Sequence, residues 1–394
     1  MENGIIKRDI FDKLESFLGT KNIIVLHGAR QVGKTHIMYF IEKFLQKRGE
    51  ETHYIDLEDS RFVEILDRGV DSFTAYLKGE GVKNKVTVFI DEIQYLQDPS
   101  SFLKLIVDHH PEIQLIVSGS SSFNIKSKFS DSLVGRTVNF EIFPLSFSEF
   151  LRFKKINTSM TDKLLSLYNE YMAYGGYPKI VLDDDIKHKE IYLQQIIDTY
   201  IRKDISDLAN VKDTKKFNDL LKVLASFSGQ LLKVSELSDI CGLALQTINS
   251  YLEILEETYI IKLVSPFSTS AKVEIAKTPK IFFYDTGILQ MLWFKRLQNG
   301  NVGNIFETSV FSELVKKFGI ENINYWRNKN MNEIDFILNK NNEILPIEVK
   351  SNFSQFKKSK INSFLEKYKI KNFYVIGLLG EKNKEYYKYP WEII

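Results

Sequence analysis

The sequence predicts an α/β protein of several modules: a parallel sheet, a helical connector, a three-helix module and a second α/β module. Short apolar runs alternate with helical patterns as far as Phe143, which is typical of a parallel sheet covered by helices. Helical patterns alone follow Pro144, and apolar runs return from Ile281. A chain of 394 residues also exceeds the size at which single cores stop growing, about 250 to 300 residues.

The composition excludes several classes of protein. Hydrophobic residues make up 44% of the chain and charged residues 26%, which is typical of a soluble globular protein. The stretch Met1–Ile10 carries charges instead of an apolar signal core, and no apolar run approaches the roughly 18 to 20 residues that span a bilayer. The single cysteine, Cys241, rules out an internal disulfide framework. We therefore expect a cytoplasmic protein with no membrane partner.

Five apolar runs form the predicted sheet of the first module, and a helical pattern at Thr35–Gln46 follows the first run. The predicted strands are Asn22–His27, His53–Leu57, Val86–Asp91, Ile113–Ser118 and Val138–Phe143. The string between the first strand and the helix satisfies the pattern GxxxxGK[ST] in the strand-loop-helix context that the pattern requires. Its residues are Gly28, Ala29, Arg30, Gln31, Val32, Gly33, Lys34 and Thr35.

This string predicts a binding site for ATP with Mg²⁺. Glycines let the loop wrap phosphate groups with backbone N–H donors, and the following helix adds the positive end of its dipole. We expect Lys34 to reach the β- and γ-phosphates and Thr35 to give its hydroxyl to Mg²⁺. The alternative is a chance glycine-lysine loop together with an acidic strand end. It is disfavoured because the loop motif and the acidic strand occur in the right order and context.

Acids at the end of a neighbouring buried strand complete the predicted hydrolytic site. Asp91 is placed to hold Mg²⁺ and its water, and Glu92 to polarise the attacking water as general base. At the end of the next strand, Ser120 is a candidate sensor of the γ-phosphate, although polar turn residues often have no such role. Arg136 would act on a neighbouring subunit's phosphate in a homo-oligomer, but a surface salt bridge is the favoured interpretation.

The middle of the chain is predicted to be helical. Helices extend over Ser146–Leu208 with a turn at Tyr174–Pro178, and three further helices precede a strand at Tyr259–Val264, which suggests a winged helix-turn-helix. The three helices are predicted at Phe217–Phe227, Val234–Ile240 and Ala244–Glu257. With a net charge of +2, affinity for nucleic acid has to come from local patches, and Lys233 and Lys262 are the nearby cations here. An interdomain packing role is therefore favoured over DNA reading through Gln246, Thr247 and Asn249.

The last module carries a second candidate site. Predicted strands at Ile334–Leu338 and Leu345–Val349 are joined by a hairpin and carry Asp335, Glu348 and Lys350. Strand alternation puts Glu348 and Lys350 on one face, where two carboxylates could bind Mg²⁺ or Mn²⁺ and the lysine could activate water. The alternative is that these acids and the lysine form ordinary cross-strand ion pairs. The sequence by itself favours this alternative, because the pattern of two acids and a lysine is short. Further strands are predicted at Ile281–Tyr284, Ile323–Trp326 and Phe373–Ile376, with a helix at Asn304–Lys317.

Taken together, these motifs resemble the AAA-type P-loop ATPases of bacteria and archaea that carry a C-terminal restriction-endonuclease-like domain of unknown function. The resemblance spans nearly the whole chain. It rests on Gly28–Thr35, Asp91–Gln94, Ser118–Ser121, Ser132–Arg136, Phe143–Ser146, Tyr174–Pro178, Tyr284–Gly287 and the acid and lysine cluster of the last module. It implies that Glu307 is an extra acid of the metal site, beside Asp335 and Glu348. Whether nuclease chemistry survives is left open, since related domains can keep a fold and lose the chemistry.

The predicted domains are 1–145 for the ATPase core, 146–210 for the helical connector, 211–268 for the winged helix and 269–394 for the restriction-endonuclease-like domain. The expected function is an ATPase that acts on DNA or RNA through its C-terminal modules. The alternative is a nucleotide-switched machine that binds a protein partner and has a degenerate nuclease-like domain. A metabolic P-loop kinase ranks last, because a small-substrate acceptor site is not apparent.

Overall fold

The computed structural model describes residues 5–119, 133–268, 278–298, 303–328, 330–341 and 343–393. The chain divides into two compact units, Met1–Phe143 (unit 1) and Pro144–Ile394 (unit 2). Within the described residues, no helix combines the length and the apolarity needed to cross a membrane.

Unit 1 contains a parallel sheet of five strands in the order β2-β3-β4-β1-β5, which confirms the predicted sheet. The strands are β1 (Ile23–His27), β2 (Glu51–Asp56), β3 (Val86–Asp91), β4 (Ile113–Gly119) and β5 (Thr137–Glu141). Every residue of β1, β3 and β4 is buried, which explains why these strands are continuous apolar runs in the sequence. Because neighbouring parallel strands end at the same edge, the loops after β1, β3 and β4 lie together.

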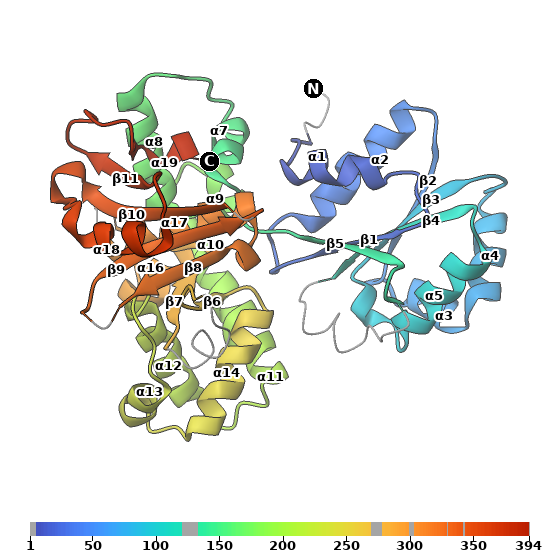
Figure 1. Cartoon of the computed structure of the whole chain (residues 1–394). Coiled ribbons are helices and arrows are strands. Elements are labelled where there is room, and N and C mark those ends of the chain that lie inside the picture. Colours follow the sequence, from blue (N-terminus) through green and yellow to red (C-terminus); the bar gives the residue numbers. More distant parts are fainter. Residues whose placement is uncertain are drawn as a thin grey trace. The chain divides into compact units, whose positions relative to one another are not determined.

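Helices cover both faces of this sheet (Figure 1). The helices of unit 1 are α1 (Ile10–Leu14), α2 (Lys34–Lys47), α3 (Ser60–Asp67), α4 (Val70–Gly79) and α5 (Pro99–His109), with short 3-10 turns at Glu15–Phe17 and Ile93–Tyr95. Phe73 of α4 and Leu103 of α5 belong to one core cluster with alternate residues of the central strands, such as Val25 and Val88. Figure 1 shows α1 and α2 on the opposite face. The sheet is therefore buried on both sides, as the sequence pattern predicts.

Unit 2 begins with the predicted helical region. Its helices are α7 (Phe147–Phe153), α8 (Thr161–Tyr174), α9 (Pro178–Leu182) and α10 (Ile186–Ile196), followed by a π-helical segment at Ile197–Ile205 and by α11 (Ser206–Leu208). Ser146 and Glu149 form a capping box at the start of α7. The turn after α8 contains Gly175 with φ 79°, in the left-handed region that favours glycine.

Three helices and a two-stranded antiparallel sheet follow in unit 2. They are α12 (Thr214–Ser226), α13 (Val234–Cys241), α14 (Leu245–Glu257), β6 (Ile261–Val264) and β7 (Lys280–Phe283). The strand predicted at Ile281–Tyr284 is present as β7, but it lies outside the five-stranded sheet of the last module, because Ile281 pairs with Leu263 of β6. Lys280 also forms an isolated bridge with Leu231. The strand is therefore the partner of the strand that precedes it in the chain.

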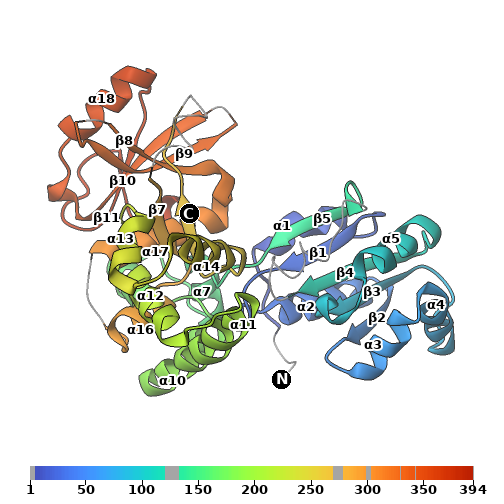
Figure 2. The ribbon, with the colours of Figure 1, turned by 90° about the horizontal axis from the view of Figure 1, so that it is seen from below.

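The last part of unit 2 is a mixed sheet in the order β12-β11-β10-β9-β8. Its strands are β8 (Ile323–Arg327), β9 (Glu333–Lys340), β10 (Glu343–Asn352), β11 (Tyr374–Leu379) and β12 (Tyr387–Lys388). The predicted hairpin between β9 and β10 is confirmed, with Asn341 at φ 52°. The neighbouring helices are α16 (Thr286–Phe294), α17 (Gly303–Phe318), α18 (Ser359–Tyr368) and α19 (Pro390–Ile393), and α17 and α18 lie on opposite faces of the sheet (Figure 2).

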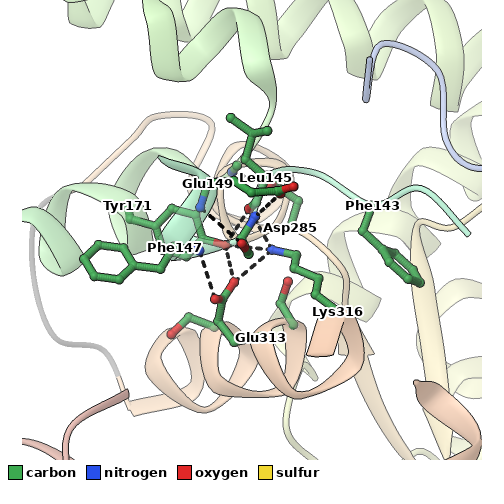
Figure 3. A network of polar contacts seen from close by, with 12 residues as sticks. Phe143, Leu145, Phe147, Glu149, Tyr171, Asp285, Glu313 and Lys316 are labelled. Atoms are coloured by element: carbon green, nitrogen blue, oxygen red, sulfur yellow. Dashed lines mark hydrogen bonds and ion pairs between the residues drawn. The ribbon is translucent and has the colours of Figure 1, made fainter. Parts of the chain in front are cut away.

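A buried polar network holds the start of unit 2 against α8 and α17 (Figure 3). The Leu145 carbonyl accepts hydrogen bonds from the Tyr171 hydroxyl at 2.8 Å and from Lys316 Nζ at 3.0 Å. The Asp285 carboxylate accepts the backbone N–H of Gly176 at 2.8 Å and of Ile288 at 3.0 Å. The conformations of the segment after Pro144 and of the turn after α8 are thus fixed by side chains from far along the chain.

Candidate functional site

The loop Gly28–Thr35 connects the buried end of β1 to the first turn of α2. Gly28 has φ 156°, and a Cβ atom there would overlap the carbonyl group of Ile142. Gly33 has φ 96°, in the left-handed region, and directly precedes the helix. Both glycines are therefore required by the path of the backbone, as the phosphate-binding pattern expects.

Lys34 is held inside this loop. Its Nζ donates to the carbonyl oxygens of Gly28 at 3.0 Å and Ala29 at 2.9 Å. An ammonium group has three N–H donors, so these bonds leave one for a phosphate oxygen. Burial lowers the pKa of Lys34 to about 8, although the charges of Glu92 and Asp91 oppose this shift. The ammonium thus lies in a desolvated position where an anionic ligand would stabilise its charge.

Asp91, at the end of β3, is the centre of the acidic side of the site. Its carboxylate accepts hydrogen bonds from the hydroxyls of Thr35 at 2.8 Å, Tyr54 at 2.8 Å and Ser118. Burial and the Asp91 charge raise the pKa of Tyr54, so its hydroxyl stays a donor. The paired oxygens of Thr35 and Asp91 fit a Mg²⁺ ion, which takes one or two protein oxygens and keeps several waters.

Glu92 follows Asp91 with φ 57°, a left-handed conformation that is uncommon for glutamate. Its backbone N–H donates to Ser118 Oγ at 3.2 Å, and its carboxylate accepts a hydrogen bond from the Gln94 side-chain amide. Strained backbone of this kind persists where surrounding contacts hold it, often at functional sites. Two adjacent acids therefore take different directions, and only Asp91 is bonded to Thr35 among the contacts described.

The predicted residues Gly28–Thr35, Asp91 and Glu92 lie together at the same edge of the sheet. Ser120 lies outside the described residues, and the hydroxyl that reaches Asp91 is that of Ser118. Arg136 pairs with Asp108, Nε to Oδ1 at 2.8 Å, in agreement with the salt-bridge interpretation.

Two contacts of this site were missed by sequence reasoning. Tyr54 lies near the end of the strand beside β3, and a search for polar residues at neighbouring strand ends would have found it. Arg8 lies before α1 and donates to carbonyl oxygens of Val32 and Phe143. No local pattern marks that arginine, because its partners are 24 and 135 residues away.

The acid and lysine cluster of unit 2 lies where the pairing between β9 and β10 ends. Their ladder extends to the pair Phe336–Ile347, and the Asp335 carboxylate then accepts the backbone N–H of Val349 at 2.7 Å. Lys350 Nζ lies 3.0 Å from Asp335 Oδ2 and 2.6 Å from Glu348 Oε2. The three predicted residues are thus in direct contact through the lysine.

Glu348 is 2% exposed, and its Oε1 atom is buried without a hydrogen-bond partner. Burial and the charge of Asp335 raise the pKa of Glu348 to about 8. Burial also acts on Asp335, but Lys350 and Lys280 outweigh it and hold the pKa of this carboxyl below its usual value. The cluster therefore combines Asp335, whose pKa is lowered, with Glu348, whose pKa is raised to about 8.

Glu307, the extra acid implied by the resemblance, contacts a lysine that the sequence did not single out. Lys280 is 2% exposed, and its Nζ lies 3.1 Å from Glu307 Oε1 and 2.7 Å from Glu333 Oε1. Burial and the charge of Asp335 raise the pKa of Glu307 to about 7. Lys280 is thus a second lysine of the cluster, and its charge offsets that of Glu307 and Glu333.

The fit of this cluster to a metal ion rests on few donors. In the described ranges, no group of three or more acidic, histidine or cysteine side chains is arranged to hold a metal ion. Asp335 and Glu348 are the two acids that share Lys350, and the unbonded Glu348 Oε1 is a ligand atom in need of a partner. Two carboxylates would supply only a minority of the ligands of a divalent cation, and water would have to complete its shell.

The three-helix region shows few features of a DNA-binding surface. Gln246 and Asn249 are exposed at the start of α14 and Thr247 is half-buried. Lys262 forms an ion pair with Glu256 at 2.9 Å, which reduces the positive charge available to phosphates. Phe353, an aromatic that follows the last cluster in the chain, is buried in the core.

The region around the loop Gly28–Thr35 is similar to a known family of domains. Residues 20–151 match the model of an AAA domain. This part of the chain is therefore similar to AAA domains. Residues 165–299 and 302–390 match the models of two domains of unknown function, so two further matched regions follow the one that matches the AAA domain.

Other proteins are similar to this chain over most of its length. An uncharacterized protein of Methanocaldococcus jannaschii is 29% identical over 87% of this chain and 77% of its own length. An uncharacterized protein of Haemophilus influenzae is 29% identical over 89% of this chain and 88% of its own. A Walker-type ATPase of Pyrococcus abyssi has a similar fold, with a TM-score of 0.50 and 15% identity over 74% of this chain and 96% of its own.

Proposed function

We propose that the AAA domain binds ATP with Mg²⁺ and hydrolyses it. The observation that carries the proposal is the joint placement of Lys34 on two loop carbonyls and of Thr35 on Asp91. Lys34 would bind the β- and γ-phosphates, Thr35 and Asp91 would hold the Mg²⁺ ion, and Glu92 would accept a proton from the attacking water. Mg²⁺, when bound, would neutralise charge that develops on the phosphates.

Steady-state ATP hydrolysis by the full-length chain tests this proposal. Lys34→Ala should lose phosphate binding and reduce hydrolysis to background, because it removes the buried ammonium. Lys47→Ala is the matched control, since Lys47 lies at the exposed end of the same helix. Equal rates for the wild type and Lys34→Ala would show that any observed hydrolysis comes from another source.

A second candidate function is metal-dependent cleavage of nucleic acid in unit 2. The specific observation in its favour is the unbonded Glu348 Oε1 beside Asp335 and Lys350. Asp335 and Glu348 would hold a divalent cation, which activates water when bound, and Lys350 would stabilise charge on the phosphate. We also assign α12 to α14 with β6 and β7 as a winged helix, whose packing role stays favoured over a contact with DNA or RNA.

The alternative output is a nucleotide-dependent contact with a protein partner. The ion pair of Lys280 with Glu307 favours this interpretation, because it neutralises an acid that the resemblance assigns to the metal site of a nuclease. Cleavage of plasmid and single-stranded DNA and RNA with Mg²⁺ or Mn²⁺ separates the two. The nuclease is supported if Lys350→Met abolishes cleavage and Lys357→Met, in the same unit, leaves it intact. Cleavage that Lys350→Met leaves unchanged rejects it.

A further inference from the structure

Arg8 connects the phosphate-binding loop to the end of unit 1. The residue is 8% exposed and lies just before α1. Its Nη1 donates to the Val32 carbonyl at 2.9 Å, and its Nη2 donates to the Phe143 carbonyl at 2.9 Å. One planar guanidinium thus bridges two carbonyl groups, a geometry that its rigid fork of donors permits.

The bond to Val32 fixes the orientation of a peptide group in the loop. In a planar trans peptide, the carbonyl of one residue and the N–H of the next point in opposite directions. Because Arg8 holds the Val32 oxygen, the Gly33 N–H faces away from Arg8. Backbone N–H groups of this loop are the donors that wrap a phosphate.

The start of the loop, at Gly28, is held by residues 142 and 143. Arg8 donates a hydrogen bond to the same short segment. The Ile142 N–H donates to the His27 carbonyl at 2.7 Å, and the Ile142 carbonyl packs against Gly28, where a side chain would not fit. Residues 142 and 143 therefore hold the loop at Gly28 directly and at Val32 through Arg8. A loop fixed at both ends has less conformational entropy to lose when a phosphate binds.

We propose that Arg8 is a positioning residue of the nucleotide site, which orders the loop Gly28–Thr35 so that the Gly33 N–H meets the phosphates. This inference rests on the proposed binding of ATP. It assigns to Arg8 no contact with the nucleotide. Its effect is on the affinity for the phosphate groups, and it requires a guanidinium because a lysine ammonium lacks the planar fork.

The test measures ADP and ATP affinity and thermal unfolding of the full-length wild type, Arg8→Lys and Arg8→Ala. We expect Arg8→Lys to unfold near the wild-type temperature and to bind both nucleotides on the order of tenfold more weakly. Guanidinium ions at millimolar concentration should restore the affinity of Arg8→Ala, and ammonium ions at equal concentration should not. Arg48→Gln, which removes an exposed arginine paired with Glu50 in the same unit, is the control and should bind like the wild type.

Separate outcomes reject the inference and the proposed function. If the wild type binds nucleotide and Arg8→Lys binds it equally well, Arg8 does not position the loop. Restoration by ammonium as well as by guanidinium would also overturn the inference, since a charge alone would then suffice. If the wild type binds neither ADP nor ATP, the proposed function fails and the role of Arg8 fails with it. If Arg8→Ala does not fold, the Arg8→Lys result decides.

Discussion

Phe147 donates its backbone N–H to the carboxylate of Glu313 at 2.9 Å, across 166 residues of the chain. Glu313 is fully buried, and its other oxygen accepts the Tyr171 hydroxyl at 2.5 Å and Lys316 Nζ at 3.1 Å (Figure 3). A buried carboxylate is tolerated only when it is paired and hydrogen-bonded. Glu313 therefore joins α7, α8 and α17 within unit 2.

Replacement of Glu313 should strongly destabilise unit 2. Glu313→Ala leaves the Phe147 N–H and the Lys316 charge without this partner, which costs about 3 to 5 kcal/mol when a buried ion pair is broken from one side. Urea unfolding followed by tryptophan fluorescence measures this loss, because all three tryptophans lie in unit 2. Glu366→Ala, at an exposed position of α18, should change the free energy of unfolding by less than about 0.5 kcal/mol. Equal effects of the two substitutions would contradict the assigned role of Glu313.

ATP binding should take up a proton at alkaline pH. Burial lowers the pKa of Lys34 to about 8 in the free protein, and bound phosphate should raise it by favouring the ammonium. Below about pH 7 the lysine is already charged and the affinity should be flat, whereas above about pH 8 each binding event must protonate it and the affinity should fall. Calorimetry in buffers of different ionisation enthalpy measures the uptake. Binding at about pH 9 without proton uptake would contradict the shifted pKa.

The Tyr54 hydroxyl should support Mg²⁺ binding through Asp91. Tyr54→Phe keeps the ring that stacks on Tyr39 with centroids 4.8 Å apart, and removes the hydrogen bond to Asp91. We expect a few-fold higher Mg²⁺ requirement for hydrolysis, because outer contacts orient metal ligands. Tyr76→Phe is the matched control, since it removes a hydroxyl bonded to His53 instead. A Mg²⁺ titration that gives the same midpoint for both variants rules out this role for Tyr54.

The stability of unit 2 should decrease as pH rises toward alkaline values. Burial and the Asp335 charge raise the pKa of Glu348 from 4.5 to about 8. Between these values the folded state binds more protons than the unfolded state, so the free energy of unfolding falls as pH increases through the window. Glu348→Gln has no proton to lose there and should show a flatter profile in urea unfolding followed by tryptophan fluorescence. A profile as steep as that of the wild type would show that Glu348 titrates normally.

The sequence predicted the nucleotide site better than its surroundings, and the reason is the distance between contacting residues. Gly28–Thr35 is contiguous, and Asp91 ends a buried strand, so both carry a local pattern. Arg8 and Tyr54 reach the same site only through tertiary packing. No local pattern marks Arg8, whereas the place of Tyr54 near a strand end beside β3 is a signal that motif matching does not use.

The fold of unit 2 shows the same limit. Its helices and the β9–β10 hairpin follow from periodicity and turn residues, but β7 was grouped with the strands of the last module and pairs with β6. Apolar runs of four residues do not specify their partner, which depends on register and burial in the folded chain. Lys280 was missed for the same reason, because its acidic partners lie on α17 and β9.

Glu92→Gln tests the central claim, that the loop and the two acids form one hydrolytic site, most directly. The substitution keeps the size of the side chain and removes the base, so ATP should bind with an affinity close to that of the wild type while the hydrolysis rate falls by about a hundredfold or more. Glu64→Gln, at an exposed position of α3, is the control and should hydrolyse ATP normally. The measurement is the single-turnover hydrolysis rate at saturating ATP and Mg²⁺. A rate for Glu92→Gln equal to that of the wild type would contradict the account.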